Sequence, residues 1–506
     1  MADTNYYLKL FQVDLQRLEH LVGEALRKGG SYCDLYFEST SYSDLLLRDG
    51  VVSSGGFHVD YGCGIRVLCG EKTGYSYTES TTPEALAEAA RCAGAIASGS
   101  GIVASGPGAS SHRAGNCGSP RVISGPQTTG PLIGTTQNTA PRIGGQQTAF
   151  YGMEEDWREV QLKRHLPFLE RLESEIRSRD SRVVKVIAML SNQVSDIMMY
   201  NSLGELVCDT RPLGSLTVTV VFRQGGKTQT SSVSRSLRGG AEILSERLLE
   251  EVAKEAVLRT DHLFAARRPK GGRMPVVMGA GASGILLHEA MGHAFEADFN
   301  RKGQSIFSDK MGKRVCPRGI NIVDDATLPS NRGSLHFDDE GVAGQKTYMV
   351  RDGILTSFLH DRISAAHYGV APTGNGRRES FRYNPIPRMR ATYMENGTDG
   401  TAEDIISTVR KGIYVDTFAN GQVKIGEGDF TFFVKTAFLI ENGRLTTPVS
   451  NINIIGNGPR ALSDITAVGS DLKVDNGAWV CGKEQSVPVS CGIPTVLIKE
   501  LTVGGE

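Results

Sequence analysis

The first hundred residues alternate between helical and strand-like patterns of hydrophobic and polar positions. Residues 14–30, DLQRLEHLVGEALRKGG, place apolar side chains at helical spacing and end in two glycines, which predicts an amphipathic helix. Residues 82–97 predict a second helix, which opens with a Thr-Pro pair in cap and first-turn positions. Short alternating segments typical of antiparallel strands lie between them, at residues 32–39, 43–50, 61–70 and 72–80. Residues 1–98 are therefore expected to form an N-terminal α/β domain.

Residues 99–150 differ in composition from the rest of the chain. Residues 99–148 are rich in Gly, Ser, Thr, Pro and Gln, contain no Asp, Glu or Lys, and show no periodicity. This composition predicts a flexible insert without a core of its own. The lack of Asp, Glu and Lys also fits a stretch translated from a shifted reading frame, which inspection of the coding sequence would decide.

Periodic patterns resume at residue 151, and residues 151–268 are expected to form a middle α/β domain. Amphipathic helices are predicted over residues 160–180 and 241–264. The strand-like segments between them are residues 182–191, 193–202, 204–210 and 214–226. The basic stretch 266–273, ARRPKGGR, is expected to be a linker because it contains Pro and two Gly.

The remaining residues, 273–506, read mainly as short strands. Two short helical pieces interrupt them, one around the sequence HEAMGH and one over residues 403–412. The predicted strands lie within residues 319–325, 346–361, 388–397, 435–446, 450–456 and 494–505. The predicted class is therefore α+β, with an N-terminal α/β region and a strand-rich C-terminal domain that carries the HEAMGH helix.

Composition limits the classes of partner. The chain has 506 residues, enough for two to three domains, with 40% hydrophobic and 22% charged residues. A formal net charge of -1 gives no electrostatic reason to expect nucleic acid or a membrane as a partner. The N-terminus lacks the basic start and apolar run of a signal peptide, and nine scattered cysteines without a CxxC pair indicate reduced thiols. A cytoplasmic location is expected.

The sequence HEAMGH, residues 288–293, is similar to the HExxH zinc-binding helix but separates its histidines by five positions instead of four. On an ideal α-helix, four steps bring two side chains within roughly 40° of each other, whereas five steps leave them about 140° apart. Both imidazoles face one metal ion only if the turn gains a residue, as a π-type turn does. Gly292 is a weak helix former and lowers the cost of such a distortion. We predict a widened turn between His288 and His293.

Chance is the alternative explanation for this string, since it is expected in roughly one protein in a hundred of this length. The apolar flank GAGASGILL favours metal binding, because it would bury both histidines and a buried neutral imidazole needs a partner. A catalytic zinc ion commonly takes three protein ligands. Spacing leaves the third ligand open among Glu296, Asp298, His336, His360, His367, Cys316, Cys481 and Cys491.

Two further segments each allow two interpretations. Arg377 and Arg378, within TGNGRRES, would hold a peptide carboxylate or backbone carbonyls through charge-assisted bonds, or form a structural salt bridge. The strand-like sequence RMRATYM, residues 388–394, would offer its edge to an extended peptide, or lie in the interior as an ordinary core strand.

Six motifs follow one another along the chain: GAGASGILLHEAMGHAFEADFNRKGQSIFS, TGNGRRESFRYNPIPRMRATYMENG, NGQVKIGEGDF, AFLIENGRLTTPV, IIGNGPRAL and DLKVDNGAWVCGKEQSVPV. In these motifs and their order the chain resembles the TldD branch of the TldD/PmbA family. The resemblance covers most of the chain from about residue 151 to the end and, more loosely, residues 14–98.

This resemblance implies a set of site residues. The family binds zinc through the two histidines of HExxxH and a cysteine near the C-terminus, in the motif that here reads DNGAWVCGK. On this sequence the implied metal ligands are His288, His293 and Cys481, and the implied catalytic base is Glu289. Glu296 becomes a candidate for orienting one imidazole.

The resemblance also implies an activity: a cytoplasmic zinc-dependent metalloprotease that cleaves peptides or unfolded protein segments by Glu-assisted attack of a zinc-bound water. Family members, once described as modulators of DNA gyrase, act as heterodimers of a metal-binding TldD-like subunit and a PmbA-like subunit that lacks the metal. Peptides are thought to be held as extended strands in an enclosed cavity.

Two alternatives remain. The first is a metal-stabilised peptide-binding or gyrase-associated regulatory protein without turnover. Glu289 argues against it, because a structural zinc site fills its fourth position with a protein ligand and needs no base. The second alternative is the non-catalytic partner subunit. It is disfavoured because all four motif residues are present, namely His288, Glu289, His293 and Cys481.

Overall fold

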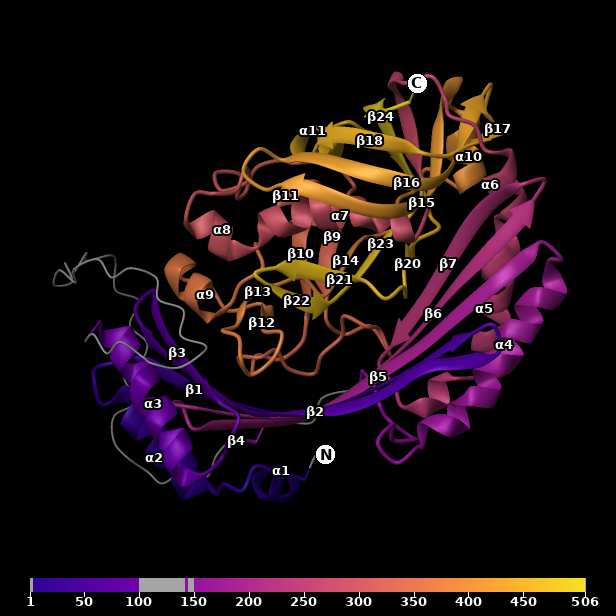
Figure 1. Cartoon of the computed structure of the whole chain (residues 1–506). Coiled ribbons are helices and arrows are strands. Elements are labelled where there is room, and N and C mark those ends of the chain that lie inside the picture. Colours follow the sequence, from indigo (N-terminus) through magenta and orange to yellow (C-terminus); the bar gives the residue numbers. More distant parts are fainter. Residues whose placement is uncertain (1–2, 100–141, 144–149, 506) are drawn as a thin grey trace. The chain divides into compact units, whose positions relative to one another are not determined.

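The computed structural model describes residues 3–99, 142–143 and 150–505 (Figure 1). Most of the predicted insert, residues 99–150, lies outside the described residues. The predictions of a flexible insert and of a shifted reading frame concern this part of the chain. The described residues form two compact units: residues 3–37, 61–99, 142–143 and 198–208, and residues 38–60, 150–197 and 209–505. Helices and strands are both abundant, which confirms the α+β class. No described helix has the length and apolarity needed to span a membrane.

The first unit contains three helices. Both predicted helices are present, as α2 (Leu15–Leu26) and α3 (Pro83–Ser98), and a short α1 (Thr4–Leu10) that was not predicted precedes them. Asp14 begins α2 by accepting a hydrogen bond from the backbone N–H of Arg17. The helices pack closely, since a Cβ added to Gly94 would lie 2.2 Å from the carbonyl oxygen of Ala25.

Long strands form one large sheet. The sheet has the order β3-β2-β1-β5-β6-β4, with β7 paired to β6. Its strands are β1 (Tyr32–Arg48), β2 (Val51–Cys69), β3 (Lys72–Thr78), β4 (Arg142–Ile143), β5 (Val183–Asn201), β6 (Glu205–Gln224) and β7 (Lys227–Leu237).

The prediction of short strands in this sheet was wrong. Residues 32–39 and 43–50 belong to the single strand β1, and the four segments predicted between residues 182 and 226 form only β5 and β6. Polar residues in or beside the gaps between the predicted segments pair across the sheet instead. Thr40 Oγ1 donates to Ser195 Oγ at 2.9 Å, and Ser43 Oγ donates to the Asn192 side chain at 2.9 Å.

Helices of the middle region pack on this sheet through a shared hydrophobic core. The helix predicted over 160–180 is present as α4 (Leu166–Arg179) after a short 3-10 turn. The single helix predicted over 241–264 was wrong: the chain forms a 3-10 turn, α5 (Glu246–Leu258) and α6 (Thr260–Ala265). Ser245 explains the first break, because its side chain accepts from the Leu248 N–H at 3.2 Å and so begins α5.

Five strands of the C-terminal region form a closed β-barrel, and Figure 1 labels four of them, β15, β16, β18 and β24. The barrel closes because β15 pairs with both β8 and β16, so that the strands run in the order β15-β8-β24-β18-β16. The strands are β8 (Gly272–Met278), β15 (Lys411–Lys424), β16 (Asp429–Glu441), β18 (Ile452–Asn457) and β24 (Val496–Val503), with β17 (Arg444–Val449) and β19 (Ile465–Val468) at its sides. Buried side chains of these strands, such as Val415, Phe432 and Ile498, belong to the largest core cluster.

A six-stranded sheet accompanies the barrel, in the order β11-β10-β9-β14-β23-β20. Its strands are β9 (Ile322–Asp325), β10 (Lys346–Arg351), β11 (Ile354–Leu355), β14 (Ala391–Met394), β20 (Lys473–Val474) and β23 (Ser490–Ile493). β14, which lies in the sequence RMRATYM, pairs with β9 on one side and β23 on the other. It is therefore an interior core strand and has no edge to offer a peptide.

Candidate metal centre

A broken helix after β8 carries both histidines of HEAMGH. It consists of η3 (Ala282–Gly284), α7 (Ile285–Leu287), the π-helical turn η4 (His288–Gly292), η5 (His293–Phe295) and α8 (Ala297–Arg301). The predicted widened turn is confirmed, because the π-helical turn lies between the two histidines. The two imidazole rings are 5.0 Å apart between centroids, and their planes are 82° apart.

Two glycines set how closely this helix packs. A Cβ at Gly284 would lie 2.4 Å from the backbone nitrogen of Gly492 in β23. Gly292 has ordinary helical angles, φ −55° and ψ −53°, but a Cβ there would lie 2.1 Å from the sulfur of Met389. The structure therefore gives Gly292 a packing role, since its backbone angles suit any residue.

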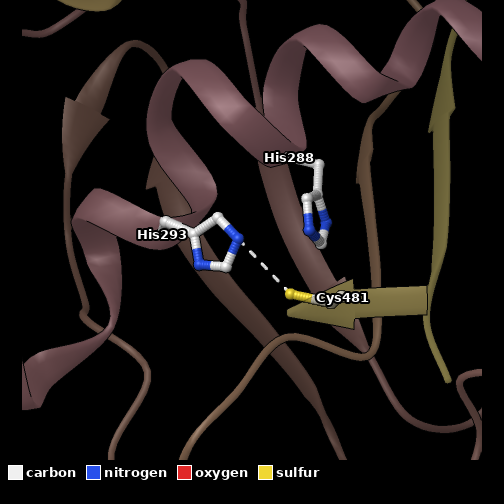
Figure 2. Close-up of side chains that lie close together, drawn as sticks. All are labelled: His288, His293 and Cys481. Carbon is white, nitrogen blue, oxygen red and sulfur yellow. Dashed lines mark hydrogen bonds between the residues drawn. The ribbon is translucent and has the colours of Figure 1, made fainter. Parts of the chain in front are cut away.

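Cys481 approaches the histidines from a separate hairpin. Strands β21 (Val480–Lys483) and β22 (Gln485–Pro488) form this hairpin, and Cys481 Sγ lies 3.3 Å from Nε2 of His293 (Figure 2). One ligand atom each from His288, His293 and Cys481 lies within 4.8 Å of the other two. All three residues are buried. In the described part of the chain, no other such group of His, Cys, Asp and Glu side chains occurs.

The other candidates for a third ligand have different surroundings. Glu296 contacts His293 on the side of the ring away from Cys481, and Asp298 forms an ion pair with Lys483 at 2.8 Å. The three candidate histidines have neighbours elsewhere: His336 lies 3.0 Å from Asp209, His360 lies 3.3 Å from Ser364, and His367 lies beside Tyr368. Cys316 and Cys491 lie in the hydrophobic core. The structure thus brings together the three residues that the resemblance implied.

Glu296 fixes the orientation of His293. Its Oε2 lies 3.0 Å from Nδ1 of His293 and accepts a hydrogen bond from that nitrogen, which turns Nε2 of the ring toward Cys481. Burial raises the pKa of Glu296, but Lys483 and His293 outweigh this effect and hold it at about 2. Nδ1 of His288 is buried and has no hydrogen-bond partner among the described residues.

The donor set fits a divalent metal that accepts nitrogen and sulfur. Burial raises the pKa of the Cys481 thiol, but the rings of His288 and His293 lower it to about 4, which favours the thiolate, the form of cysteine that binds metals. In a tetrahedral zinc site, bond lengths of about 2.0 Å to nitrogen and 2.3 Å to sulfur place these atoms roughly 3.5 Å apart. The observed distance of 3.3 Å between His293 Nε2 and Cys481 Sγ is close to that value.

Glu289 is the acidic group next to the first histidine. Its side chain is partly exposed, and burial raises its pKa against the opposing charges of His288 and His293. It lies against barrel strand β15, because a Cβ at Gly421 would be 3.4 Å from its Cγ. A proton acceptor therefore lies on the same turn as the histidine pair.

The arginines of TGNGRRES bond to the chain itself. Arg377 donates to the carbonyl oxygens of Met389 at 2.5 Å and Pro488 at 2.8 Å, and Arg378 donates to the carbonyl oxygen of Asp339 at 3.0 Å. Both side chains are buried. These contacts are structural, and one of them anchors the end of the Cys481 hairpin.

Three domain models of one protein family match this chain. PmbA/TldA metallopeptidase domain 1 matches residues 33–97, the central domain matches 155–263, and the C-terminal domain matches 271–505. A protein named "Metalloprotease TldD homolog" from Haemophilus influenzae is 37% identical, over 94% of this chain and 93% of that protein. The chain belongs to the TldD/PmbA metallopeptidase family. Because relatives of this chain are named metalloproteases, the chain is assigned to the metalloproteases.

Two further proteins are similar to this chain. A "Zinc metalloprotease TldD homolog" from Saccharolobus solfataricus is 33% identical, over 58% of this chain and 65% of that protein. The crystal structure of TldE from Thermococcus kodakarensis has a TM-score of 0.72 and 18% sequence identity, over 97% of this chain and 100% of that chain. At this sequence identity, the structural similarity shows that this chain and TldE share a fold.

Proposed function

We propose that the chain is a zinc-dependent metallopeptidase that cleaves peptides or unfolded protein segments. His288, His293 and Cys481 are the metal ligands, and Glu289 is the general base. The observation that carries this proposal is the buried convergence of two imidazoles and a thiolate within 4.8 Å, beside a carboxylate. Nitrogen and sulfur donors suit zinc, and the relative from Saccharolobus solfataricus is named a zinc metalloprotease.

The chemistry divides between the metal and the chain. A bound zinc ion supplies a Lewis acid that polarises the scissile carbonyl and lowers the pKa of water. Glu289 accepts the proton of the attacking water and delivers it to the leaving amine. Burial raises its pKa toward the operating pH, which suits a group that both accepts and donates a proton. With the Cys481 thiolate as a ligand, a bound zinc ion would be a weaker Lewis acid than with three neutral ligands, so more of the activation would fall on Glu289.

The active form is proposed to contain a second, PmbA-like subunit that holds no metal. The likeness of fold between this chain and TldE supports pairing of two similar chains. The second subunit would complete the enclosure around an extended peptide.

Metal analysis combined with peptide digestion tests this proposal. The purified chain and its Cys481→Ala variant are assayed for zinc per chain and for cleavage of an unfolded polypeptide, with and without a PmbA-like subunit. We expect about one zinc per wild-type chain, cleavage in the presence of the partner, and loss of both in the variant. A full zinc complement in the variant would move the third ligand to Glu296 or Cys491. Zinc binding without cleavage under either condition would favour a metal-stabilised peptide-binding protein.

A further inference from the structure

A fully buried guanidinium links the Cys481 hairpin to the histidine helix. Arg388 donates from Nη2 to the carbonyl oxygen of Cys481 at 2.5 Å and from Nη1 to that of Gln485 at 2.8 Å. Its Nε lies 3.8 Å from Oε1 of Glu296, the residue that holds His293. One side chain therefore contacts the backbone of one proposed ligand and the hydrogen-bond partner of another.

A second cation makes the same link from the opposite direction. Lys483 belongs to the hairpin, two residues after Cys481, and its Nζ lies 3.1 Å from Oε2 of Glu296. It also lies 2.8 Å from Oδ1 of Asp298 in α8 and donates to the carbonyl oxygen of Pro387 at 3.1 Å. Its side chain is only 6% exposed, so these charged contacts are weakly screened by solvent.

The hairpin needs such anchors to hold its position. His293 and Cys481 are 188 residues apart in the chain, and among the described strands β21 and β22 pair only with each other. A two-stranded hairpin is marginally stable by itself, so external contacts must fix its place beside the helix. Arg388 donates to two carbonyl oxygens of the hairpin, and Lys483 ties the hairpin to Glu296 and Asp298.

We propose that Arg388 and Lys483 are positioning residues that set the separation between His293 Nε2 and Cys481 Sγ, and with it the affinity for the metal. This inference rests on the proposed ligand set of His288, His293 and Cys481. Neither cation contacts a proposed ligand atom. Both act through Glu296 and through the backbone of the hairpin.

The test compares Arg388→Lys and Lys483→Gln with a matched control, Arg390→Lys. Lysine keeps the charge of Arg388 but cannot bond both hairpin carbonyls, and glutamine is too short and uncharged to hold both acids. Arg390 is equally buried and donates to the carbonyl oxygen of Gly374, away from the hairpin. For each protein, the zinc dissociation constant is measured by chelator competition, the visible absorption of the Co(II) form is recorded, and the metal-free melting temperature is determined.

We expect zinc to bind about 10-fold or more weakly to both positioning variants, as for other partners of metal ligands, with an altered thiolate-to-Co(II) band. Arg390→Lys should lower the melting temperature without changing either metal readout. If Arg388→Lys does not fold, Lys483→Gln decides the outcome.

Two results would overturn the inference. Wild-type zinc affinity and cobalt absorption in a folded Lys483→Gln protein would contradict the positioning role and leave the ligand set intact. An equal loss of affinity in Arg390→Lys would reduce the effect to general destabilisation. Failure of the wild-type chain to bind zinc would instead refute the proposed function.

Discussion

Two of the three proposed ligands are prepared by a neighbouring side chain, and the third has a free ring nitrogen. Glu296 holds Nδ1 of His293 at 3.0 Å, and the two imidazoles keep the pKa of the Cys481 thiol at about 4. His288 presents a buried Nδ1 that has no hydrogen-bond partner in the described part of the chain. The three side chains already converge in this structure, so the site is organised to receive a metal.

Part of this site could be predicted from the sequence. The five-residue separation of His288 and His293 predicted the π-helical turn, because helical geometry alone decides whether two side chains share a face. The third ligand was not accessible in this way, since Cys481 reaches the site only through tertiary structure and spacing left eight candidates. Arg388 and Lys483 were missed altogether, because nothing in a local pattern indicates which carbonyls or acids a buried cation will contact.

Gly292→Ala tests the packing role assigned to this glycine. The added methyl group meets the Met389 sulfur, and we expect a loss of about 1–3 kcal/mol in the free energy of unfolding, together with weaker metal binding. Gly482→Ala is the matched control, because a Cβ there meets nothing within 4 Å. Equal unfolding free energies for both variants, measured in urea, would show that Gly292 is not constrained by space.

At the scale of elements, periodicity located helices better than strand ends. The helices at α2, α3 and α4 were predicted because their apolar faces repeat at helical spacing. Strands β1, β5 and β6 are longer than predicted, since polar side chains that look like breaks pair across the sheet. Barrel closure, which requires β15 to pair with both β8 and β16, leaves no mark on the local pattern.

The contact between β1 and the segment around Phe381 predicts a pH dependence of stability. Glu38 accepts from the Phe381 N–H and from Thr40 Oγ1, both at 2.7 Å, and burial raises its pKa to about 7. From about pH 4.5 to 7 the folded form keeps the proton that the unfolded form has lost, so stability falls as pH rises. Above about pH 7 the stabilisation by the protonated Glu38 side chain has been lost completely.

We expect the wild type to lose roughly 2 kcal/mol of unfolding free energy more than Glu38→Gln between pH 5 and pH 8. Glutamine does not ionise, so this contribution is missing from the variant. The measurement is urea unfolding of both proteins at the two pH values. Parallel pH profiles would show that Glu38 ionises normally in the folded protein.

For the whole molecule, the site is part of a large hydrophobic core. Cys481 belongs to the same cluster as Met291, Phe432 and Val487, which joins the helix, the barrel and the hairpin. Packing on this scale supports the fold with or without a bound ion. The situation differs from small zinc domains, whose folding depends on the metal.

Metal removal should therefore lower stability without unfolding the chain. After chelator treatment we expect unchanged far-ultraviolet circular dichroism and a lower melting temperature that zinc restores. Free zinc at 100 times its dissociation constant adds about 2.7 kcal/mol of stability. Cys481→Ala is the control, and its melting temperature should respond little to zinc. Loss of secondary structure on chelation would contradict a preorganised site.

The most direct test of the proposed mechanism is zinc content and peptide cleavage measured on the same preparation of Glu289→Gln, beside the wild type and with a PmbA-like subunit present. Glutamine keeps the size of the side chain but accepts no proton at this position. We predict wild-type zinc content and a fall in cleavage of about 100-fold or more, because general acid–base groups contribute on that order. Retained cleavage by the fully metal-loaded variant would contradict the role of Glu289 as the base.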